Sequence, residues 1–87
     1  MAYKVVKKNV LNPQIFLMEV EAPLVAKKAE PGQFIILRID EYGERVPFTI
    51  ADFDREKGTV TIIVQIVGKT TKDLAQVEEG EEILDFA

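Results

Sequence analysis

The sequence predicts an all-β fold: a six-stranded antiparallel Greek-key barrel with one short helix between the fifth and sixth strands. Three observations support this prediction. Short stretches rich in β-branched and aromatic residues recur along the chain, turn-forming residues separate them, and a single helix signal stands before the last stretch. A barrel accommodates such strands without leaving a long unpaired edge.

The composition excludes several classes of function. The chain has 87 residues, and we expect residues 1–87 to form one small domain. Its 11 basic and 15 acidic residues give a net charge of −4, which disfavours binding to nucleic acid or to anionic membranes. With no Cys and no His, disulfides, the usual zinc sites, thiol nucleophiles and imidazole catalysis are excluded. No stretch has the length of a membrane span or signal peptide, so we expect a cytoplasmic protein.

The strands are expected between turn-forming pairs such as Asn12-Pro13. The segment 24–30 is too short for a stable helix, and we expect a loop or a single turn. The apolar run that follows Gln33 is typical of a strand buried on both faces or of one that closes a barrel, and we place it centrally. The six expected strands cover residues 3–8, 15–22, 34–39, 46–53, 59–67 and 82–86.

The fifth expected strand carries an aliphatic residue at every second position, so one of its faces should belong to the core. These residues are Val60, Ile62, Val64 and Ile66. Aromatic side chains should fill much of the remaining core. Those expected there are Phe34, Phe48, Phe53 and Phe86.

The stretch 43–50 is the most distinctive part of the chain. Pro47 removes a backbone donor from a strand-like run, which suits an edge or a bulge and leaves backbone free to face a ligand. Phe48 and Thr49 then offer an apolar ring and a hydroxyl side by side, which suits a planar polar heterocycle such as a flavin. The alternative is structural: Pro47 marks an edge, Phe48 lies in the core and Thr49 is an ordinary strand residue.

The run Gly68-Lys69-Thr70-Thr71 lies between the fifth strand and the helix. A threonine hydroxyl should cap this helix, and the free N–H groups at its start favour an anion such as phosphate. A P-loop would need another glycine at position 63, which is Ile63, so a nucleotide hydrolase is excluded. Phosphate binding and simple capping both remain open.

Carboxylates gather in two expected turns, at Asp52 with Asp54 and in the run 78–82. Charged runs in turns are usually solvated surface. We therefore expect no metal site and no pair of catalytic carboxylates there.

Three segments together resemble the flavin-binding barrel of the ferredoxin–NADP reductase superfamily. They are Pro31-Gly32-Gln33-Phe34, the segment 45–50, and the fifth strand with the turn that follows it. The likeness is greatest to the electron-transfer subunit of dihydroorotate dehydrogenase and to the small subunit of NADH-dependent ferredoxin:NADP oxidoreductase, also known as a sulfide dehydrogenase subunit. It covers essentially the whole chain and implies FAD as the cofactor.

The resemblance also implies which residues contact FAD. Phe48 would take the place of the family's aromatic ring, Thr49 would hydrogen-bond near flavin N5, and Pro47 would shape the approach. The residues implied for the ribityl and adenine side are Ile63, Val64 and Gln65, and those for the phosphates are Gly68, Thr70 and Thr71.

One position departs from the family pattern. Aligning Phe48-Thr49 on the family's aromatic and hydroxyl residues places Val46, not Arg45, at the phosphate-binding arginine. On a regular strand, Arg45 would then face the opposite way. Either a bulge corrects the register or another group, such as Lys69, supplies the positive charge.

Reductases of this superfamily continue into a nicotinamide-binding domain and, in the nearest relatives, a cysteine cluster that binds an iron–sulfur centre. The resemblance therefore implies a fragment of an NAD(P)H-dependent oxidoreductase that can hold the flavin but is inactive alone. Its partners would be the missing nicotinamide domain and a large oxidoreductase subunit with iron–sulfur centres. The alternative is a non-catalytic interaction module with a vestigial flavin site, whose exposed interface would favour self-association.

Overall fold

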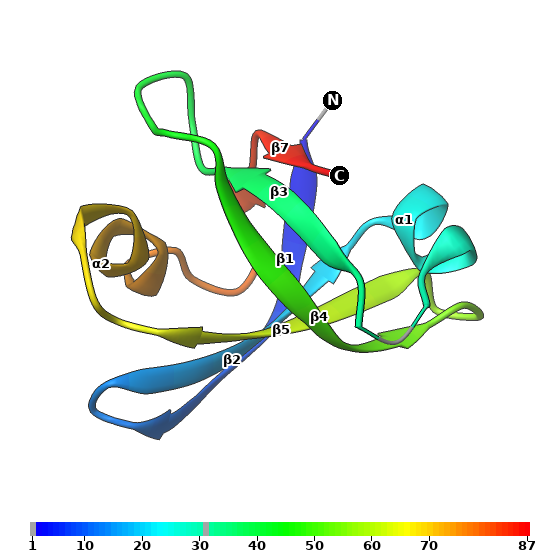
Figure 1. Ribbon diagram of the computed structural model, residues 1–87, viewed down its shortest axis with the longest axis horizontal. Helices are drawn as coiled ribbons and strands as arrows, with labels where there is room; N and C mark the ends of the chain where they lie inside the picture. The colour runs from blue at the N-terminus through cyan, green and yellow to red at the C-terminus, as the bar shows by residue number, and fades with distance from the viewer. Residues whose placement is uncertain (1, 31) are drawn as a thin grey trace.

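The computed structural model describes residues 2–30 and 32–87, so Pro31 of the resemblance motif lies outside the described residues. Antiparallel strands form one sheet that curls into a nearly closed barrel (Figure 1), which confirms the predicted fold class. The order in the sheet is β6-β1-β2-β5-β4-β3-β7. The strands are β1 (Tyr3–Asn12), β2 (Ile15–Glu21), β3 (Phe34–Arg38), β4 (Val46–Asp54), β5 (Thr59–Gln65), β6 (Glu82–Ile83) and β7 (Asp85–Phe86).

The described chain has seven strands rather than the six predicted, because the expected strand 82–86 divides in two. β6 pairs with β1, whereas β7 pairs with β3 at the other end of the sheet. Between them, Leu84 donates its N–H to the Ile39 carbonyl at 3.0 Å. Leu84 belongs to neither strand pairing. The short segment 82–86 therefore pairs with β1 at one edge of the sheet and with β3 at the other, and so brings the two edges together.

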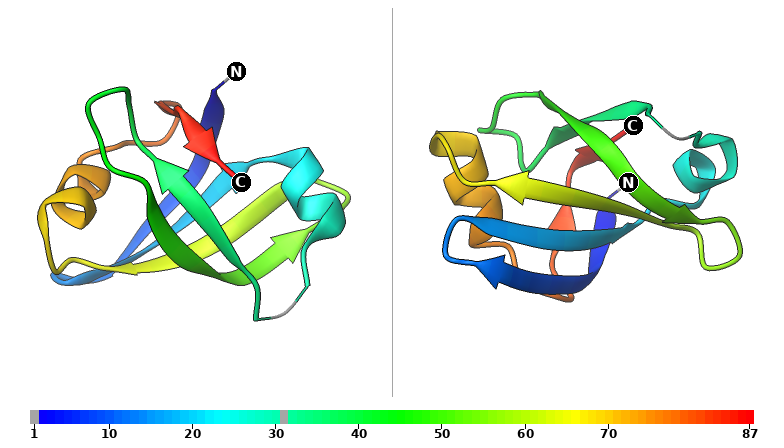
Figure 2. Two further views of the ribbon diagram at one scale, coloured as in Figure 1. Left: turned by 45° about the horizontal axis from the view of Figure 1, so that its top comes forward. Right: turned by 60° about the horizontal axis from the view of Figure 1, so that its bottom comes forward.

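Two helices lie at opposite ends of the barrel in every view (Figure 2), namely α1 (Pro23–Lys28) and α2 (Lys69–Ala75). The prediction of a loop or single turn for 24–30 was wrong. Pro23 stands in the first turn of α1, where its missing N–H is not needed, and Lys27 and Lys28 lie in the last turn, which favours cations. In the described chain, no helix is long and apolar enough to cross a membrane.

The core follows the predicted alternation of β5, since Val60, Ile62 and Val64 are fully buried. The prediction for β3 was wrong in two respects. β3 is next to the end of the sheet rather than central, and Phe34 is 64% exposed rather than buried. Ile35 and Leu37 face the core, so the side chains that alternate with them face outward.

Candidate functional site

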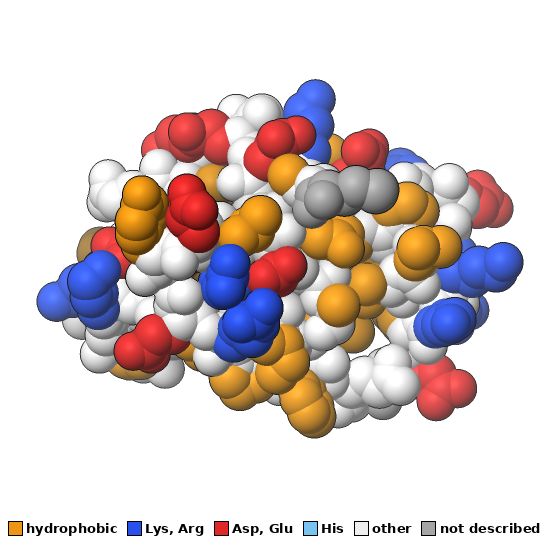
Figure 3. All heavy atoms as spheres, turned by 90° about the horizontal axis from the view of Figure 1, so that it is seen from above, with side chains coloured by type: hydrophobic (Ala, Val, Ile, Leu, Met, Phe, Trp, Pro, Cys, Tyr) orange, Lys and Arg blue, Asp and Glu red, His pale blue; other side chains and the backbone are white. Residues whose placement is uncertain are grey.

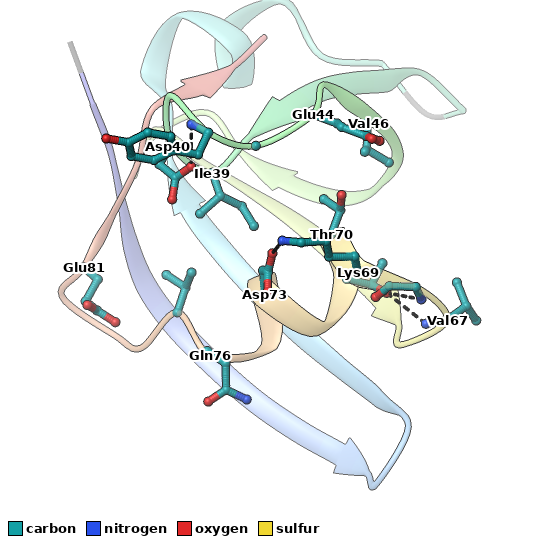
Figure 4. A pocket seen from close by; sticks show the side chains of 15 residues that line it. Ile39, Asp40, Glu44, Val46, Val67, Lys69, Thr70, Asp73, Gln76 and Glu81 are labelled. Atoms are coloured by element: carbon teal, nitrogen blue, oxygen red, sulfur yellow. Dashed lines mark hydrogen bonds and ion pairs between the residues drawn. The ribbon is translucent and has the colours of Figure 1, made fainter.

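A cavity of ≈ 720 Å³ lies between the start of α2 and the segment 39–45, which connects β3 to β4 (Figure 4). The turn into α2 contributes Val67 to Thr71, the connecting segment contributes Tyr42 and Glu44, and β4 contributes its first residue, Val46. The cavity thus lies between the turn into α2 and the first residues of the stretch 43–50, whereas Phe48 and Thr49 do not line it.

The start of α2 is held by Thr71. Its Oγ1 accepts hydrogen bonds from the backbone N–H groups of Val67 and Gly68, at 2.8 and 2.9 Å, and donates one to the Gly68 carbonyl at 3.0 Å. The N-cap is Gly68, so the prediction of a threonine at the N-cap was wrong. The hydroxyl acts from the first turn of the helix instead, and it fixes the backbone that borders the cavity.

The other end of α2 is held by Lys8 of β1. The Lys8 side chain is 9% exposed, and its ammonium donates to the carbonyl of Ala75, the last residue of α2. It also lies 3.7 Å from Glu78 Oε1 and 5.5 Å from the centre of the Phe16 ring. A cation at this end is favoured by the helix dipole. Together with the buried Leu74, Lys8 therefore positions the helix whose start lines the cavity.

The described cavity walls carry four carboxylates and one ammonium, that of Lys69. Lys69 Nζ lies 2.8 Å from Asp73 Oδ2, and this hydrogen bond raises the pKa of the fully exposed Lys69, with smaller contributions from Asp40 and Glu44. Because this pKa is raised, the ammonium stays charged up to a pH above the ordinary lysine pKa, and the pairing is lost only as the pH rises through the raised pKa. Lys69 is therefore a cation throughout the neutral range.

Gly68 has no structural need to be glycine. Its φ of −159° is extended backbone that any residue adopts, and a Cβ built at this position would meet nothing within 4 Å. Gly58 and Gly80, by contrast, have φ of +69° and +91°. Glycine also serves where backbone must be approached closely by a ligand. The open space at Gly68 therefore fits a group that lies against the turn into α2.

The other predicted site residues divide between the two faces of β4 and β5. Pro47 and Thr49 are exposed on β4, and Ile63 and Gln65 are exposed on β5. The remaining three, Val46, Phe48 and Val64, face inward. Val64 is fully buried, while Val46 and Phe48 are partly buried and lie opposite the core residues Leu37 and Ile35. Phe48 and Thr49 are thus adjacent in sequence but point to opposite sides of the sheet.

Arg45 forms an ion pair outside this cavity. Its Nη2 lies 3.3 Å from Asp85 Oδ2, which is also 3.4 Å from Nε of Arg38. The pairing of β3 with β4 is regular from Val46 to Thr49, and the irregularity of β4 lies later, between Ile50 and Asp52 in its pairing with β5. Arg45 itself lies just before β4 and outside this pairing, whereas Lys69 lines the cavity.

The carboxylates of the two acidic turns stabilise backbone. Asp54 Oδ1 accepts the N–H groups of Glu56 and Lys57, both at 3.0 Å, and Glu79 Oε2 accepts that of Lys8 at 2.8 Å. Over residues 2–30 and 32–87, no group of three or more acidic side chains is arranged to hold a metal ion.

Two features of the surface could not be predicted from the sequence. Tyr42 is 91% exposed and lies in a turn whose sequence is typical of a polar loop. Nothing in the sequence indicates that Tyr42 borders a cavity. Phe34 lies in an apolar run, so its exposure is not obvious from the sequence. Arg38 lies on the same face of β3 as Phe34, and its charge is the sequence signal that this face points outward.

No family model matches the chain, but it is similar to known proteins in both sequence and fold. It is 61% identical over 84 residues to an uncharacterized protein of the adh 3′ region from Clostridium beijerinckii, covering 97% of this chain and 28% of that protein. It is 43% identical over 82 residues to a dihydroorotate dehydrogenase B (NAD(+)) electron transfer subunit homolog from Thermotoga maritima, covering 94% of this chain and 29% of that one. The chain is therefore similar, over nearly its whole length, to a protein named as an electron transfer subunit homolog.

Comparison of the fold with solved structures gives a similar result. The solved structure of an NADH-dependent reduced ferredoxin-NADP oxidoreductase, described in connection with flavin-based electron bifurcation, superposes with a TM-score of 0.96 at 40% identity. It covers 100% of this chain, which in turn covers 32% of that protein. The resemblance to this family is therefore confirmed. The chain spans about a third of the length of the relatives that it matches.

Proposed function

We propose that the chain is the FAD-binding barrel of an NAD(P)H-dependent electron-transfer flavoprotein. The proposal is supported by one observation above all: the segments 46–49 and 63–65 lie on the neighbouring strands β4 and β5, and Val46, at the start of the first, lines one cavity together with residues 67–71. They are the segments that the family resemblance assigns to FAD. The relative with a TM-score of 0.96 is named for NADH-dependent and flavin-based chemistry.

We assign the diphosphate of FAD to the turn into α2. The open space at Gly68 admits it, Thr70 borders the same cavity, and Thr71 holds the backbone of the turn in place. The ammonium of Lys69 supplies positive charge among the surrounding carboxylates. Contact by Arg45 would require that its guanidinium leave Asp85.

The flavin and ribityl portions belong on the outer face of β4 and β5. Ile63 and Gln65 expose their side chains to the ribityl side, and Pro47 gives an apolar surface next to the Thr49 hydroxyl. We propose that Thr49 Oγ1 hydrogen-bonds near flavin N5. The residues that face inward would contribute mainly backbone contacts to FAD, while their side chains pack beneath the strands that bind it. These residues are Val46, Phe48 and Val64.

Bound FAD would supply the redox chemistry, accepting a hydride from NAD(P)H and passing single electrons onward. The chain itself has no Cys and no His, so it offers no usual ligand for an iron–sulfur centre. We therefore propose that the iron–sulfur centres and the nicotinamide site lie in other parts of a larger oxidoreductase. The role of this barrel is to bind and orient the flavin.

The first experiment is a titration of the purified chain with FAD, followed by gel filtration and absorption spectroscopy. Bands near ~370 and ~450 nm that elute with the protein would support the proposal. A parallel titration with FMN tests the adenosine end of the cavity. A folded chain that retains no flavin at high FAD concentrations would contradict the proposal, and elution as a larger species would then favour an interaction module.

Gly68→Ala should weaken FAD binding without lowering stability. The new methyl group meets nothing in the protein, and a gain of about 0.4–1 kcal/mol from a less flexible unfolded chain offsets the weaker N-cap. The methyl group would instead occupy the space proposed for the diphosphate. Thermal unfolding and FAD titration of the same variant separate the two effects. Unchanged FAD affinity would place the diphosphate elsewhere.

Thr49→Val should keep the shape of the exposed side chain and remove its hydroxyl. The loss of one hydrogen bond worth about 0.5–1.5 kcal/mol predicts an affinity for FAD about two- to twelvefold lower, with a shifted flavin spectrum. Thr61→Val, a half-buried threonine of β5, serves as the control. Equal effects of the two substitutions would argue against a special role for Thr49.

A further inference from the structure

Lys69 forms an ion pair on the wall of the cavity at α2. Its Nζ lies 2.8 Å from Oδ2 of Asp73, and both side chains line this cavity (Figure 4). Residues four apart on a helix lie on the same side of it, so the backbone of α2 brings the two groups together. Among the described residues of the cavity wall, the one ammonium therefore has a carboxylate partner from the same helix.

The surroundings of Lys69 are acidic. The hydrogen bond to Asp73 raises the pKa of Lys69 most, and Asp40 and Glu44, which line the cavity from the segment between β3 and β4, raise it further. On the face seen in Figure 3, Lys and Arg side chains stand among Asp and Glu side chains rather than in one continuous patch. An anion at this cavity is therefore attracted by Lys69 and repelled by the nearby carboxylates.

The stability of α2 does not explain the pair. The side chains of Lys69 and Asp73 are 90% and 53% exposed, and exposed ion pairs contribute little to stability. The helix dipole favours anions at the start of a helix and cations at its end, whereas Lys69 is the first residue of α2 and Asp73 lies in its last turn. Hydrogen bonds of Thr71 and Lys8 to backbone hold the two ends of the helix instead.

We infer that Asp73 limits the affinity of the cavity for FAD by competing with the diphosphate for the Lys69 ammonium. This inference rests on the proposed function and deepens it, because it adds a residue that sets the affinity for the cofactor. An ammonium has three N–H donors, so a diphosphate oxygen can replace Asp73 Oδ2 or share Lys69 with it. In either case the carboxylate of Asp73 stays close to the anion and weakens its binding.

The test compares Asp73→Asn with Glu44→Gln. Each substitution removes one carboxylate from the cavity wall, but only Asp73 forms the ion pair with Lys69. Asp73→Asn should raise the affinity for FAD about two- to fivefold, the range expected for the loss of one competing exposed ion pair, and Glu44→Gln should raise it less. Circular dichroism establishes that both variants are folded, and fluorescence titration with FAD measures the affinities.

A Lys69→Met background separates competition from simple repulsion. Without the ammonium there is nothing to compete for, so Asp73→Asn should raise the affinity for FAD less in this background than in the wild-type chain. In the wild-type chain, addition of FAD should also shift the side-chain NMR signals of Lys69 and Asp73. These shifts report on the ion pair itself, independently of the affinity.

The outcomes separate the inference from the proposed function. If the wild-type chain binds FAD but Asp73→Asn binds it no more tightly than Glu44→Gln does, the inference fails and the proposed function stands. An equal gain in the Lys69→Met background would also overturn it, because Asp73 would then act by repulsion alone. If neither the folded wild-type chain nor folded Asp73→Asn binds FAD, both fail, whereas binding by Asp73→Asn alone would support both.

Discussion

Replacing Phe86 with alanine should remove a large part of the stability of the barrel. Phe86 is fully buried on β7 and its ring centre lies 6.1 Å from that of Tyr3 on β1. Truncation of a buried phenylalanine costs about 3–5 kcal/mol. A chain of 87 residues has a total free energy of unfolding of about 4–13 kcal/mol. The variant should therefore be marginally stable or largely unfolded at 25 °C.

The matched control for this prediction is Phe34→Ala, which makes the same chemical change at an exposed position. Because Phe34 is 64% exposed, its truncation should change the free energy of unfolding by about 0.5 kcal/mol or less. Urea unfolding followed by circular dichroism measures both variants. Similar losses for the two would mean that the short closing strand β7 does not contribute as its burial indicates.

Gly58→Ala should be the second strongly destabilising change. The φ of Gly58 is +69°, which costs a side-chain-bearing residue about 1–2 kcal/mol. In addition, a Cβ at this position would lie 2.9 Å from Cβ and 3.2 Å from Cα of Pro23. Such overpacking adds about 1–3 kcal/mol. Since the Gly58 carbonyl accepts the N–H of Ala22 at 2.8 Å, the strain acts directly on the start of α1.

Gly80→Ala isolates the steric part of this effect. Gly80 also has a positive φ, of +91°, but a Cβ there would meet nothing within 4 Å. Its replacement should cost only the backbone term of about 1–2 kcal/mol. The shift of the urea midpoint should therefore be clearly larger for Gly58→Ala. Equal shifts would show that α1 moves away from the new methyl group at little cost.

Strands with clear alternation could be predicted from the sequence, and β5 is the best example. Its aliphatic residues at every second position made both its strand character and its buried face readable. Helix α1 could not be predicted in the same way. A helix of six residues is unstable alone, and its formation depends on burying Ala26 against the barrel.

The division of the last strand also has no local signal. Glu82 to Phe86 reads as one short strand, and only the positions of β1 and β3 in the closed barrel decide that its two halves pair with different edges. The same holds for the candidate site. Phe48 and Thr49 are adjacent in sequence, but the alternation of strand side chains separates them, and the pairing of β3 with β4 places Phe34 beside Thr49.

The closing segment 82–86 has a consequence for folding during synthesis. Tyr3 pairs with Ile83, and Leu37 pairs with Phe86, so neither contact can form until almost the whole of this sequence has left the ribosome. Until then, β1 and β3 each present an unpaired edge, which other nascent chains can join by strand addition. Contacts between residues so distant in sequence are also slow to form. Closure of the barrel must therefore be a late event, and the interval before it is when the chain is most open to aggregation.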